Sequence, residues 1–252
     1  MIDGLRIALG FLTVIPVRPT SGISRGQARA AMLLGPVAVL PIGVLAGLIG
    51  WGARWTGTPV LLAGVLVVAV IAMGTRGMHL DGLADTIDGL GSGPDRDKAL
   101  RVMRSGDVGP MGAAGLILVL MAQVVGFAAI LGRPWGWALI AVLVAGSRAA
   151  LALGCAVGVP PARPGGLGAL FAGSVPVWAA TLEWALVAAV LTGVGVWAGL
   201  PWWRPLVGVL VAVVGGALLL GRVVRRIGGV TGDVLGALIE SSLVLLVVVV
   251  AA

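Results

Sequence analysis

Long apolar runs limit the fold of this chain more than any other feature of its sequence. Several are long enough to cross the hydrocarbon core of a bilayer, which takes about 20 residues in a helix. The chain is 59% hydrophobic and only 11% charged, whereas about a quarter of the residues in soluble domains are charged. We therefore expect an all-α, polytopic integral membrane helix bundle with about seven transmembrane helices, six or eight being the alternatives. The expected spans cover residues 31–53, 59–77, 110–131, 135–157, 175–198, 203–221 and 234–252.

The N-terminal residues differ from these spans. Arg6 precedes a short apolar stretch, residues 7–17, and no small-x-small cleavage site follows it. A helix lying in the membrane interface is therefore favoured over a signal peptide. The chain shows no tandem repeat and no separate soluble module. Residues 1–252 are expected to form a single membrane-embedded catalytic domain, whose many glycines would let helices approach closely.

The distribution of basic residues predicts the orientation. Of the 17 Lys and Arg residues, only Arg54, Arg133 and Arg204 fall in the expected outer segments, and Arg148 lies within a span. The positive-inside rule then places the N-terminus and the acidic segment described next on the cytoplasmic side of a bacterial-type plasma membrane. The net charge of +7 reflects this topology and a mild attraction to anionic lipid, and we expect no nucleic-acid partner.

Acidic residues are concentrated in one segment. Six of the ten lie between Asp81 and Asp107. Asp81, Asp85 and Asp88 are spaced i, i+4 and i+7, which places them on one face of a helix. Like charges on one face repel each other, so the cluster needs a compensating cation. Because the chain has one His and one Cys, we expect Mg²⁺, with Mn²⁺ as the alternative, rather than zinc or copper.

Further polar residues flank the acidic cluster along the chain. The glycines of residues 89–94 form a turn whose backbone could approach a phosphate closely. Asp95 is expected to cap a short, solvated amphipathic helix that leads to Arg104. For Asp107, helix capping and contact with metal or substrate are equally open. For His79, a hydrogen bond at the membrane interface is favoured over ligation.

Two acidic residues near the C-terminus share one helical face. Asp233 and Glu240 are seven residues apart, and Glu240 is expected about two turns inside the bilayer. An ionisable residue at that depth is costly unless it is paired. Arg148 is the expected partner, either in a structural ion pair or as part of a functional site. A divalent metal, carboxylates, arginines and exposed glycine backbone together favour transfer of a phosphorylated group.

The segment His79–Gly89, which reads HLDGLADTIDG, resembles the signature of the cobalamin synthase family, also called adenosylcobinamide-GDP ribazoletransferases. The resemblance covers essentially the whole chain. Four further stretches are similar to the family in the expected order: residues 11–17, 147–148, 166–171 and 228–240. One loop departs from the family, which commonly has Asp-Ser-Arg where this chain has Ser105-Gly106-Asp107. That departure weakens any phosphate or metal role carried over to this loop.

The resemblance implies the nucleotide-loop step of cobalamin (vitamin B12) biosynthesis. A ribose hydroxyl of α-ribazole, or of its 5′-phosphate, would attack the phosphorus attached to cobinamide in adenosylcobinamide-GDP. The products would be adenosylcobalamin or its phosphate, and GMP. The enzyme would be a Mg²⁺-dependent phosphotransferase embedded in the lipid bilayer, and contacts with other nucleotide-loop assembly enzymes are a further expectation.

The resemblance also implies roles for individual residues. The expected metal ligands are Asp81, Asp85 and Asp88. The residues expected to act in catalysis are Asp88, Arg104, Arg148, Asp233 and Glu240. The two arginines would stabilise the charge of the pentacoordinate phosphorus, and one of the last two carboxylates would orient or deprotonate the attacking hydroxyl. Further cofactor and substrate contacts are expected from His79, Gly82, Gly89, Gly229, Thr231 and Gly232.

Two other classes of protein are the alternatives. A CDP-alcohol phosphotransferase-like enzyme also uses clustered aspartates on membrane helices, but its Asp-Gly is followed by two residues and then Ala-Arg. Here Gly89 is followed by Leu-Gly-Ser-Gly. A cation-coupled transporter would place its acidic residues near the midplane on paired broken helices in repeated halves, whereas most acidic residues here are expected at one end of the bundle.

Overall fold

A computed structural model describes residues 2–18 and 22–252, and in these residues the chain is a helical bundle without a named β-strand. The only β-type pairings among them are two isolated parallel bridges, Ala156 with Val175 and Pro161 with Val230. The helices are α1 (Ile2–Leu12), α2 (Arg25–Leu33), α3 (Gly35–Trp55), α4 (Val60–Gly74), α5 (Met78–Gly91), α6 (Arg96–Val102), α7 (Pro110–Leu131), α8 (Gly136–Gly146), the 3₁₀ turn η1 (Ser147–Ala149), α9 (Ala150–Gly154), α10 (Gly166–Phe171), α11 (Val177–Trp197), α12 (Trp203–Ile227) and α13 (Gly232–Ala251).

The expected membrane bundle is confirmed. Six helical segments of the described chain are long and apolar enough to cross a bilayer, and the bent pair α4–α5 brings the number to seven if it counts as one span. The six are Arg25–Trp55, Pro110–Leu131, Gly136–Gly154, Val177–Trp197, Trp203–Ile227 and Gly232–Ala251. The expected N-terminal helix corresponds to α1, Ile2–Leu12. Its buried side packs on α2, where Gly4 faces Ala30.

The second expected span is not a straight helix. Helix α4 has 15 residues, which span only about 22 Å of a hydrocarbon core of about 30 Å. It then bends by 90° into α5. At the bend, Arg76 and Gly77 adopt positive φ angles of 59° and 66°, a conformation that costs a non-glycine residue about 1–2 kcal/mol. The Arg76 Nη2 donates to the Gly10 carbonyl of α1 at 2.6 Å, which ties the bend to the N-terminal helix.

Glycines bring several helices into backbone contact, as the composition predicts. On α3, a Cβ atom at Gly43 would lie 2.8 Å from the Ala141 carbonyl oxygen of α8, and Gly47 meets the Trp137 carbonyl of the same helix. On α4, Gly64 meets the Val124 carbonyl of α7. Such contacts replace side-chain interdigitation with close approach, the usual way in which membrane helices associate.

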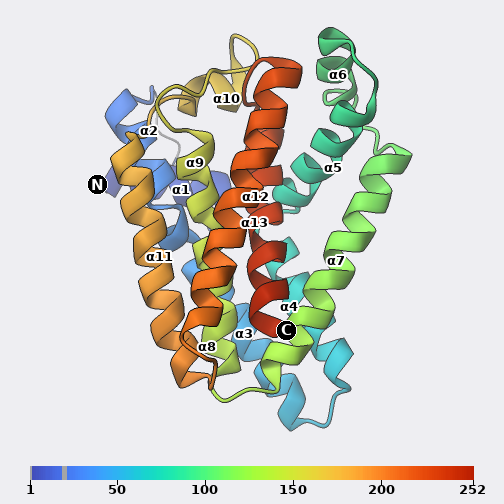
Figure 1. Cartoon of the computed structure of the whole chain (residues 1–252), viewed down its shortest axis with the longest axis vertical. Coiled ribbons are helices and arrows are strands. Elements are labelled where there is room, and N and C mark those ends of the chain that lie inside the picture. Colours follow the sequence, from blue (N-terminus) through green and yellow to red (C-terminus); the bar gives the residue numbers. More distant parts are fainter. Residues whose placement is uncertain (1, 19–21) are drawn as a thin grey trace.

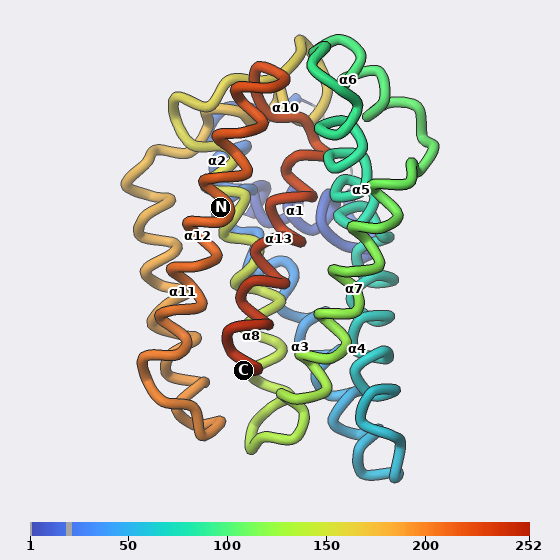
Figure 2. The backbone as a smooth tube through the Cα atoms, turned by 45° about the vertical axis from the view of Figure 1, so that its right-hand side comes forward, coloured from blue at the N-terminus to red at the C-terminus, as the bar shows by residue number. Residues whose placement is uncertain are grey.

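Helix α13 lies inside the bundle, between α12 on one side and α5 and α7 on the other (Figure 1). The short helices α6 and α10 gather at one end of the molecule, while the turns α3–α4, α7–α8 and α11–α12 lie at the opposite end (Figure 2). The end with α6 and α10 also carries the loops that join α12 to α13 and α5 to α6. The acidic helix α5 and the start of α13 therefore meet near this end.

Candidate active site

A pocket opens where α5 and α13 meet α1, α9 and α10. It has an empty volume of about 700 Å³, counting its open mouth. Its charged or ionisable lining residues are His79 and Asp81 from α5 and Asp233 from α13. The remaining lining is mostly apolar and includes Phe11 and Phe171, whose rings pack edge to face with centroids 5.4 Å apart. The two most specific sequence motifs of the chain therefore contribute to one pocket.

Glycines explain why α5 and α13 can form a common wall. A Cβ atom at Gly82 would lie 2.6 Å from the Asp233 carbonyl oxygen, and one at Gly236 would lie 3.1 Å from the His79 Cα. Any larger residue at Gly82 would push the helices apart. We expected Gly82 to contact a ligand, but its place in the structure is a helix-packing contact that brings Asp81 and Asp233 to the same pocket.

The three carboxylates of α5 lie in different surroundings. Asp81 is exposed at the pocket, whereas Asp85 and Asp88 are buried. Asp81, Asp233 and Asp88 all lie close enough to Asp85 to repel its charge. In residues 2–18 and 22–252, no three His, Cys, Asp or Glu side chains are arranged as a metal-binding group. The metal site at Asp81, Asp85 and Asp88 thus stays a prediction, and the pocket adds Asp233 as a further nearby carboxylate.

Asp88 is bound to the start of α7. Its Oδ2 accepts from the Gly109 N–H at 2.7 Å and its Oδ1 from the Gly112 N–H at 2.9 Å. These N–H groups belong to the N-cap and first turn of α7, where helix donors have no partner within the helix. A Cβ atom at Gly109 would lie 2.5 Å from the Asp88 carboxylate. Asp88 therefore caps α7 across 21 residues of sequence.

The loop between α6 and α7 lies outside the pocket lining. Arg104 and Asp107 are both exposed there, and neither contributes to the pocket wall. The N-cap of α7 is Gly109, which has no side chain, and Asp88 supplies the carboxylate acceptor. Capping of α7 by Asp107 was one of the two open interpretations, and the structure gives that role to Asp88. The catalytic role expected for Arg104 has no supporting contact within the described residues.

Arg148 and Glu240 lie buried in the bundle and outside the pocket lining. The Arg148 Nη1 donates to the Val144 carbonyl at 2.7 Å and to the Ser147 Oγ at 2.8 Å. The Glu240 Oε2 instead accepts from the Gln123 amide of α7 at 2.8 Å. Among the described residues, only Arg6–Asp3 and Arg96–Asp97 form ion pairs within 4.0 Å. The ion pair expected between Arg148 and Glu240 is therefore wrong as a direct contact.

Gln123 is a buried polar residue that our reading of the sequence missed. It stands alone in the apolar run of the expected span 110–131, and that isolation is the signal that could have identified it. A buried amide needs a partner, and Glu240 provides one. Arg148 keeps its Nε and Nη2 without a partner in the described structure. Its Cβ and the pocket residue Leu151 both lie close to Gly35.

The remaining predicted contact residues divide between the pocket and the packing around it. His79 is buried, lines the pocket and leaves both ring nitrogens without a partner in the described structure. Gly232 also lines the pocket. Thr231 is the N-cap of α13: its Oγ1 accepts from the Val234 N–H at 3.3 Å and donates to the Asp233 Oδ2 at 3.0 Å. Thr231 therefore orients the Asp233 carboxylate.

The other two predicted glycines are packing residues. Gly89 leaves no room for a side chain because a Cβ atom there would lie 2.5 Å from the Met103 Cγ. Gly229 meets the Pro160 carbonyl on the neighbouring loop. Their conformations shape the segments that flank the pocket, and neither belongs to its lining.

One basic residue comes near the pocket carboxylates from a different loop. Arg163 lies close enough to Asp233 to attract its charge. It begins a glycine-rich loop, Arg163-Pro164-Gly165-Gly166. A cation near a carboxylate at a pocket is suited to hold an anionic group of a substrate.

The donor set of the pocket fits a hard divalent cation. Asp81 and Asp233 supply carboxylate oxygens, the ligands that Mg²⁺ prefers. The like charges of Asp81, Asp85 and Asp233 lie close together, and a bound cation would relieve their repulsion.

Asp95, the N-cap of α6, is a carboxylate away from the pocket and has a different role. Its pKa is lowered by the backbone N–H groups of Lys98 and Asp97, as expected for the N-cap it was predicted to be.

Comparison with known proteins gives one family. The family model for cobalamin-5-phosphate synthase matches residues 4–251. A protein named adenosylcobinamide-GDP ribazoletransferase from a Nocardioides strain is 41% identical over 243 residues, which is 96% of each chain. A protein of the same name from Frankia casuarinae is 41% identical over 93% of this chain and 89% of its own. Another from Bradyrhizobium diazoefficiens is 34% identical over 100% of this chain and 94% of its own. No solved structure matches.

Proposed function

This chain belongs to the cobalamin-5-phosphate synthase family, and we propose that it is an adenosylcobinamide-GDP ribazoletransferase. We place the active site at the pocket because Asp81 and Asp233 both line it. These residues belong to the two motifs that most resemble the family, which lie far apart in the sequence. The family match also favours this function over a CDP-alcohol phosphotransferase or a cation-coupled transporter.

The proposed reaction is a phosphoryl substitution. A ribose hydroxyl oxygen of α-ribazole or its 5′-phosphate forms a bond to the phosphorus attached to cobinamide. The bond from that phosphorus to the bridging oxygen breaks, and GMP leaves with the oxygen. The hydroxyl proton passes to a carboxylate at the pocket. The products are adenosylcobalamin or its phosphate, and GMP.

We assign the proton-accepting role to Asp233 rather than Glu240. Asp233 lines the pocket and is oriented by the Thr231 hydroxyl, whereas Glu240 is buried and held by Gln123. A general base must come within hydrogen-bond reach of the proton that it accepts, directly or through one water. Among the two carboxylates considered, only Asp233 has such access through the pocket.

We assign Mg²⁺ binding to Asp81 and Asp85, with Asp233 as a nearby carboxylate. When bound, Mg²⁺ would neutralise charge on the diphosphate oxygens. Arg163 is suited to hold the diphosphate because it lies close enough to Asp233 to attract its charge. Arg104 is exposed and lies outside the pocket lining. Arg148 is buried, lies outside the pocket lining and keeps N–H groups without a partner in the described structure, so any effect on the transition state would be indirect. Asp88 serves by fixing α5 against α7.

We also propose the expected location. The apolar helices suit a bacterial-type plasma membrane, and the basic segments favour placing the pocket on the cytoplasmic side. The water-soluble substrates would reach the pocket from that side. Contacts with other enzymes of nucleotide-loop assembly remain a proposal without a specific surface.

The test is release of GMP from adenosylcobinamide-GDP by the purified protein in detergent. With α-ribazole and Mg²⁺ present, we expect GMP and a corrinoid carrying the lower base in equal amounts. Omission of α-ribazole should stop GMP release, which separates transfer from simple hydrolysis. A folded protein that releases no GMP under these conditions, with either α-ribazole or its 5′-phosphate, would refute the proposed function.

A further inference from the structure

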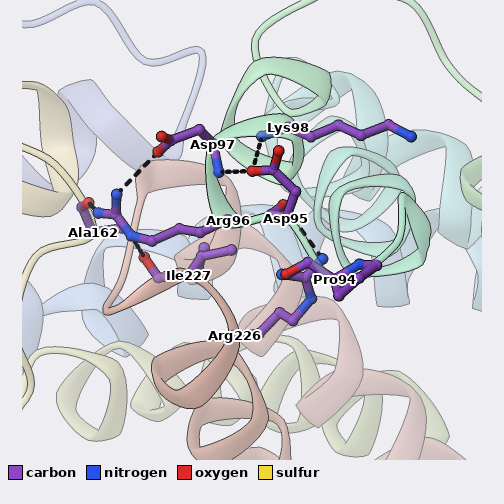
Figure 3. Close-up of polar contacts among 8 residues, drawn as sticks. All are labelled: Pro94, Asp95, Arg96, Asp97, Lys98, Ala162, Arg226 and Ile227. Carbon is purple, nitrogen blue, oxygen red and sulfur yellow. Dashed lines mark hydrogen bonds and ion pairs between the residues drawn. The ribbon is translucent and has the colours of Figure 1, made fainter.

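Arg96, the first residue of α6, joins three segments that are far apart in the sequence. Its Nε donates to the Ile227 carbonyl at 2.9 Å and its Nη2 to the Ala162 carbonyl at 2.6 Å (Figure 3). Its Nη1 contacts the Asp97 carboxylate at 3.2 Å. The Ile227 carbonyl ends α12 and has no partner further along that helix, so the guanidinium also meets the negative end of the helix dipole.

A second arginine makes the reverse connection. The Arg226 Nη1 donates to the Pro94 carbonyl at 2.7 Å, and its Nη2 lies 3.5 Å from the Asp95 carbonyl (Figure 3). The segment before α6 is thus held by residue 226, while the end of α12 is held by residue 96. We call this reciprocal pair of contacts the α6–α12 clasp. It consists of Arg96 and Arg226 with their acceptors Ala162, Ile227, Pro94 and Asp95.

The segments held by the clasp lead directly to the pocket. Ile227 precedes the turn that carries Thr231 and Asp233. Ala162 precedes Arg163, which lies near Asp233. These two segments are also bonded to each other, because the Val230 N–H donates to the Pro160 carbonyl at 2.9 Å and the Ala162 N–H donates to the Val230 carbonyl at 3.0 Å. Arg96 braces this small parallel bridge from outside.

On the other side of the clasp lies α5 with Asp81 and Asp85. Helix α6 follows α5 after a short turn, and the two helices contact each other through Gly89 and Met103. The clasp therefore connects the α5 carboxylates to the loop that presents Asp233 and Arg163. A role for Arg96 in holding substrate phosphate is disfavoured, because all three of its nitrogens already contact acceptors within the protein.

We propose that Arg96 is a positioning residue of the transfer reaction, which sets the placement of Asp233 and Arg163 relative to the α5 carboxylates through the α6–α12 clasp. The proposal rests on the proposed function for its effect on turnover, but its effect on structure is independent of activity. Arg96 touches no substrate in this arrangement. Its side chain is half exposed, so its loss should disturb the loop geometry more than the stability of the bundle.

The test compares Arg96→Ala, Arg96→Lys and Arg101→Ala in the full-length purified protein. Arg101 is exposed on the same helix, while the bonds to the Ile227 and Ala162 carbonyls come from Arg96, so Arg101 is the matched control. We expect Arg96→Ala to lower kcat by about tenfold or more, to change KM less, and to raise the Mg²⁺ concentration needed for half-maximal rate. Arg96→Lys should recover part of the rate because an ammonium can still donate to one of the two carbonyls.

Hydrogen exchange gives the readout that does not depend on turnover. In Arg96→Ala, the amides of Ala162 and Val230 should exchange faster than in the wild type and in Arg101→Ala, with little change in the melting temperature. If Arg96→Ala matches Arg101→Ala in both exchange and turnover, the proposal is overturned. Loss of turnover with unchanged exchange would also overturn it, because Arg96 would then act directly on substrate or metal.

A second variant covers the case in which Arg96→Ala does not fold. Arg226→Ala removes the other half of the clasp, and it should raise exchange at the same amides and lower kcat in the same direction by a smaller factor. Unchanged exchange and rate in Arg226→Ala would then refute the clasp. If the wild-type protein releases no GMP, the proposed function fails, while the exchange comparison still decides whether Arg96 braces the loop.

Discussion

The pocket carboxylates and the core carboxylates of this protein are chemically alike but differ in what surrounds them. Asp81 and Asp233 face the pocket and have room for a ligand. Asp88 and Glu240 lie away from it, and each accepts hydrogen bonds from the protein itself, from the α7 amides and from Gln123. The comparison teaches that position in a family motif does not fix the role of a carboxylate. The donors within reach decide whether it is available for a metal or a proton.

The largest effects should come from the pocket side of this comparison. We expect Asp81→Asn and Asp233→Asn each to reduce GMP release by at least about a hundredfold, because they remove charge where the diphosphate and the hydroxyl react. Melting temperatures should stay close to wild type, since neither carboxylate supports another helix. The exposed Asp3→Asn, which lies outside the pocket lining, serves as the control. Near-normal turnover in Asp81→Asn would break the distinction between pocket and core carboxylates.

Metal dependence also tests the distinction between the pocket carboxylates and the core carboxylates. GMP release should stop on removal of divalent cations and return with Mg²⁺ or Mn²⁺. Binding of Mn²⁺ followed by electron paramagnetic resonance should weaken in Asp81→Asn and Asp85→Asn and stay unchanged in Glu240→Gln. Weakened Mn²⁺ binding in Glu240→Gln would instead place the metal beneath the pocket.

A mutation at the shared wall should affect both activity and folding. A side chain at Gly82 would meet the Asp233 backbone at 2.6 Å, so Gly82→Ala must separate α5 from α13. Overpacking of this kind costs typically about 1–3 kcal/mol, and it moves Asp81 away from Asp233. We expect a lower melting temperature together with a loss of turnover. Gly52→Ala, where a Cβ atom meets open space, is the matched control and should change neither.

Asp88→Asn tests the role of a core carboxylate. An asparagine has one acceptor oxygen, so it can accept from Gly109 or from Gly112 as Asp88 does, but its amide nitrogen cannot accept from the other. We expect a loss of stability of about 1–3 kcal/mol, the cost of leaving a buried donor without a partner. Turnover per folded molecule should fall less than in Asp81→Asn. Full stability with abolished turnover would show that Asp88 is a direct metal ligand after all.

The smallest effect is expected at Gln123. Gln123→Leu leaves the buried Glu240 carboxylate without its donor, which should cost about 1–3 kcal/mol with little change in turnover. The conservative Gln123→Asn is the comparison, because its shorter amide should restore the hydrogen bond only in part. Thermal unfolding in detergent and GMP release together would check this. A turnover loss as large as that of Asp233→Asn would place Glu240 in the chemistry.

Much of the bundle could be predicted because the length of each apolar run can be read from the sequence and compared with the thickness of a bilayer. Spans such as 110–131 agree closely with α7. The 90° bend between α4 and α5 could not be predicted in the same way. Hydropathy indicates which residues lie in the membrane, but it does not give the direction of the helix axis. The bend depends on the positive φ angles of Arg76 and Gly77 and on the bond from Arg76 to α1, which are tertiary features.

The candidate site could be predicted only in part, because the spacing of residues along the chain does not say which other segments they meet in space. The i, i+4, i+7 spacing identifies a shared helical face for Asp81, Asp85 and Asp88, but it cannot say what faces each residue. The donors to Asp88 lie more than 20 residues away, at the start of α7. Charge complementarity suggested Arg148 as the partner of Glu240, whereas a neutral amide at Gln123 takes that place. Neutral partners leave no charge signal in a sequence.

The central place of α13 has a consequence for the way the protein is made. Helix α5 leaves the ribosome well before α13, so for most of synthesis Asp81 has no opposite wall and the pocket does not exist. Until α13 is in place, the α5 carboxylates lack Asp233 as the carboxylate on the opposite wall. Both walls of the pocket are present only once α13 lies between α12 and α5.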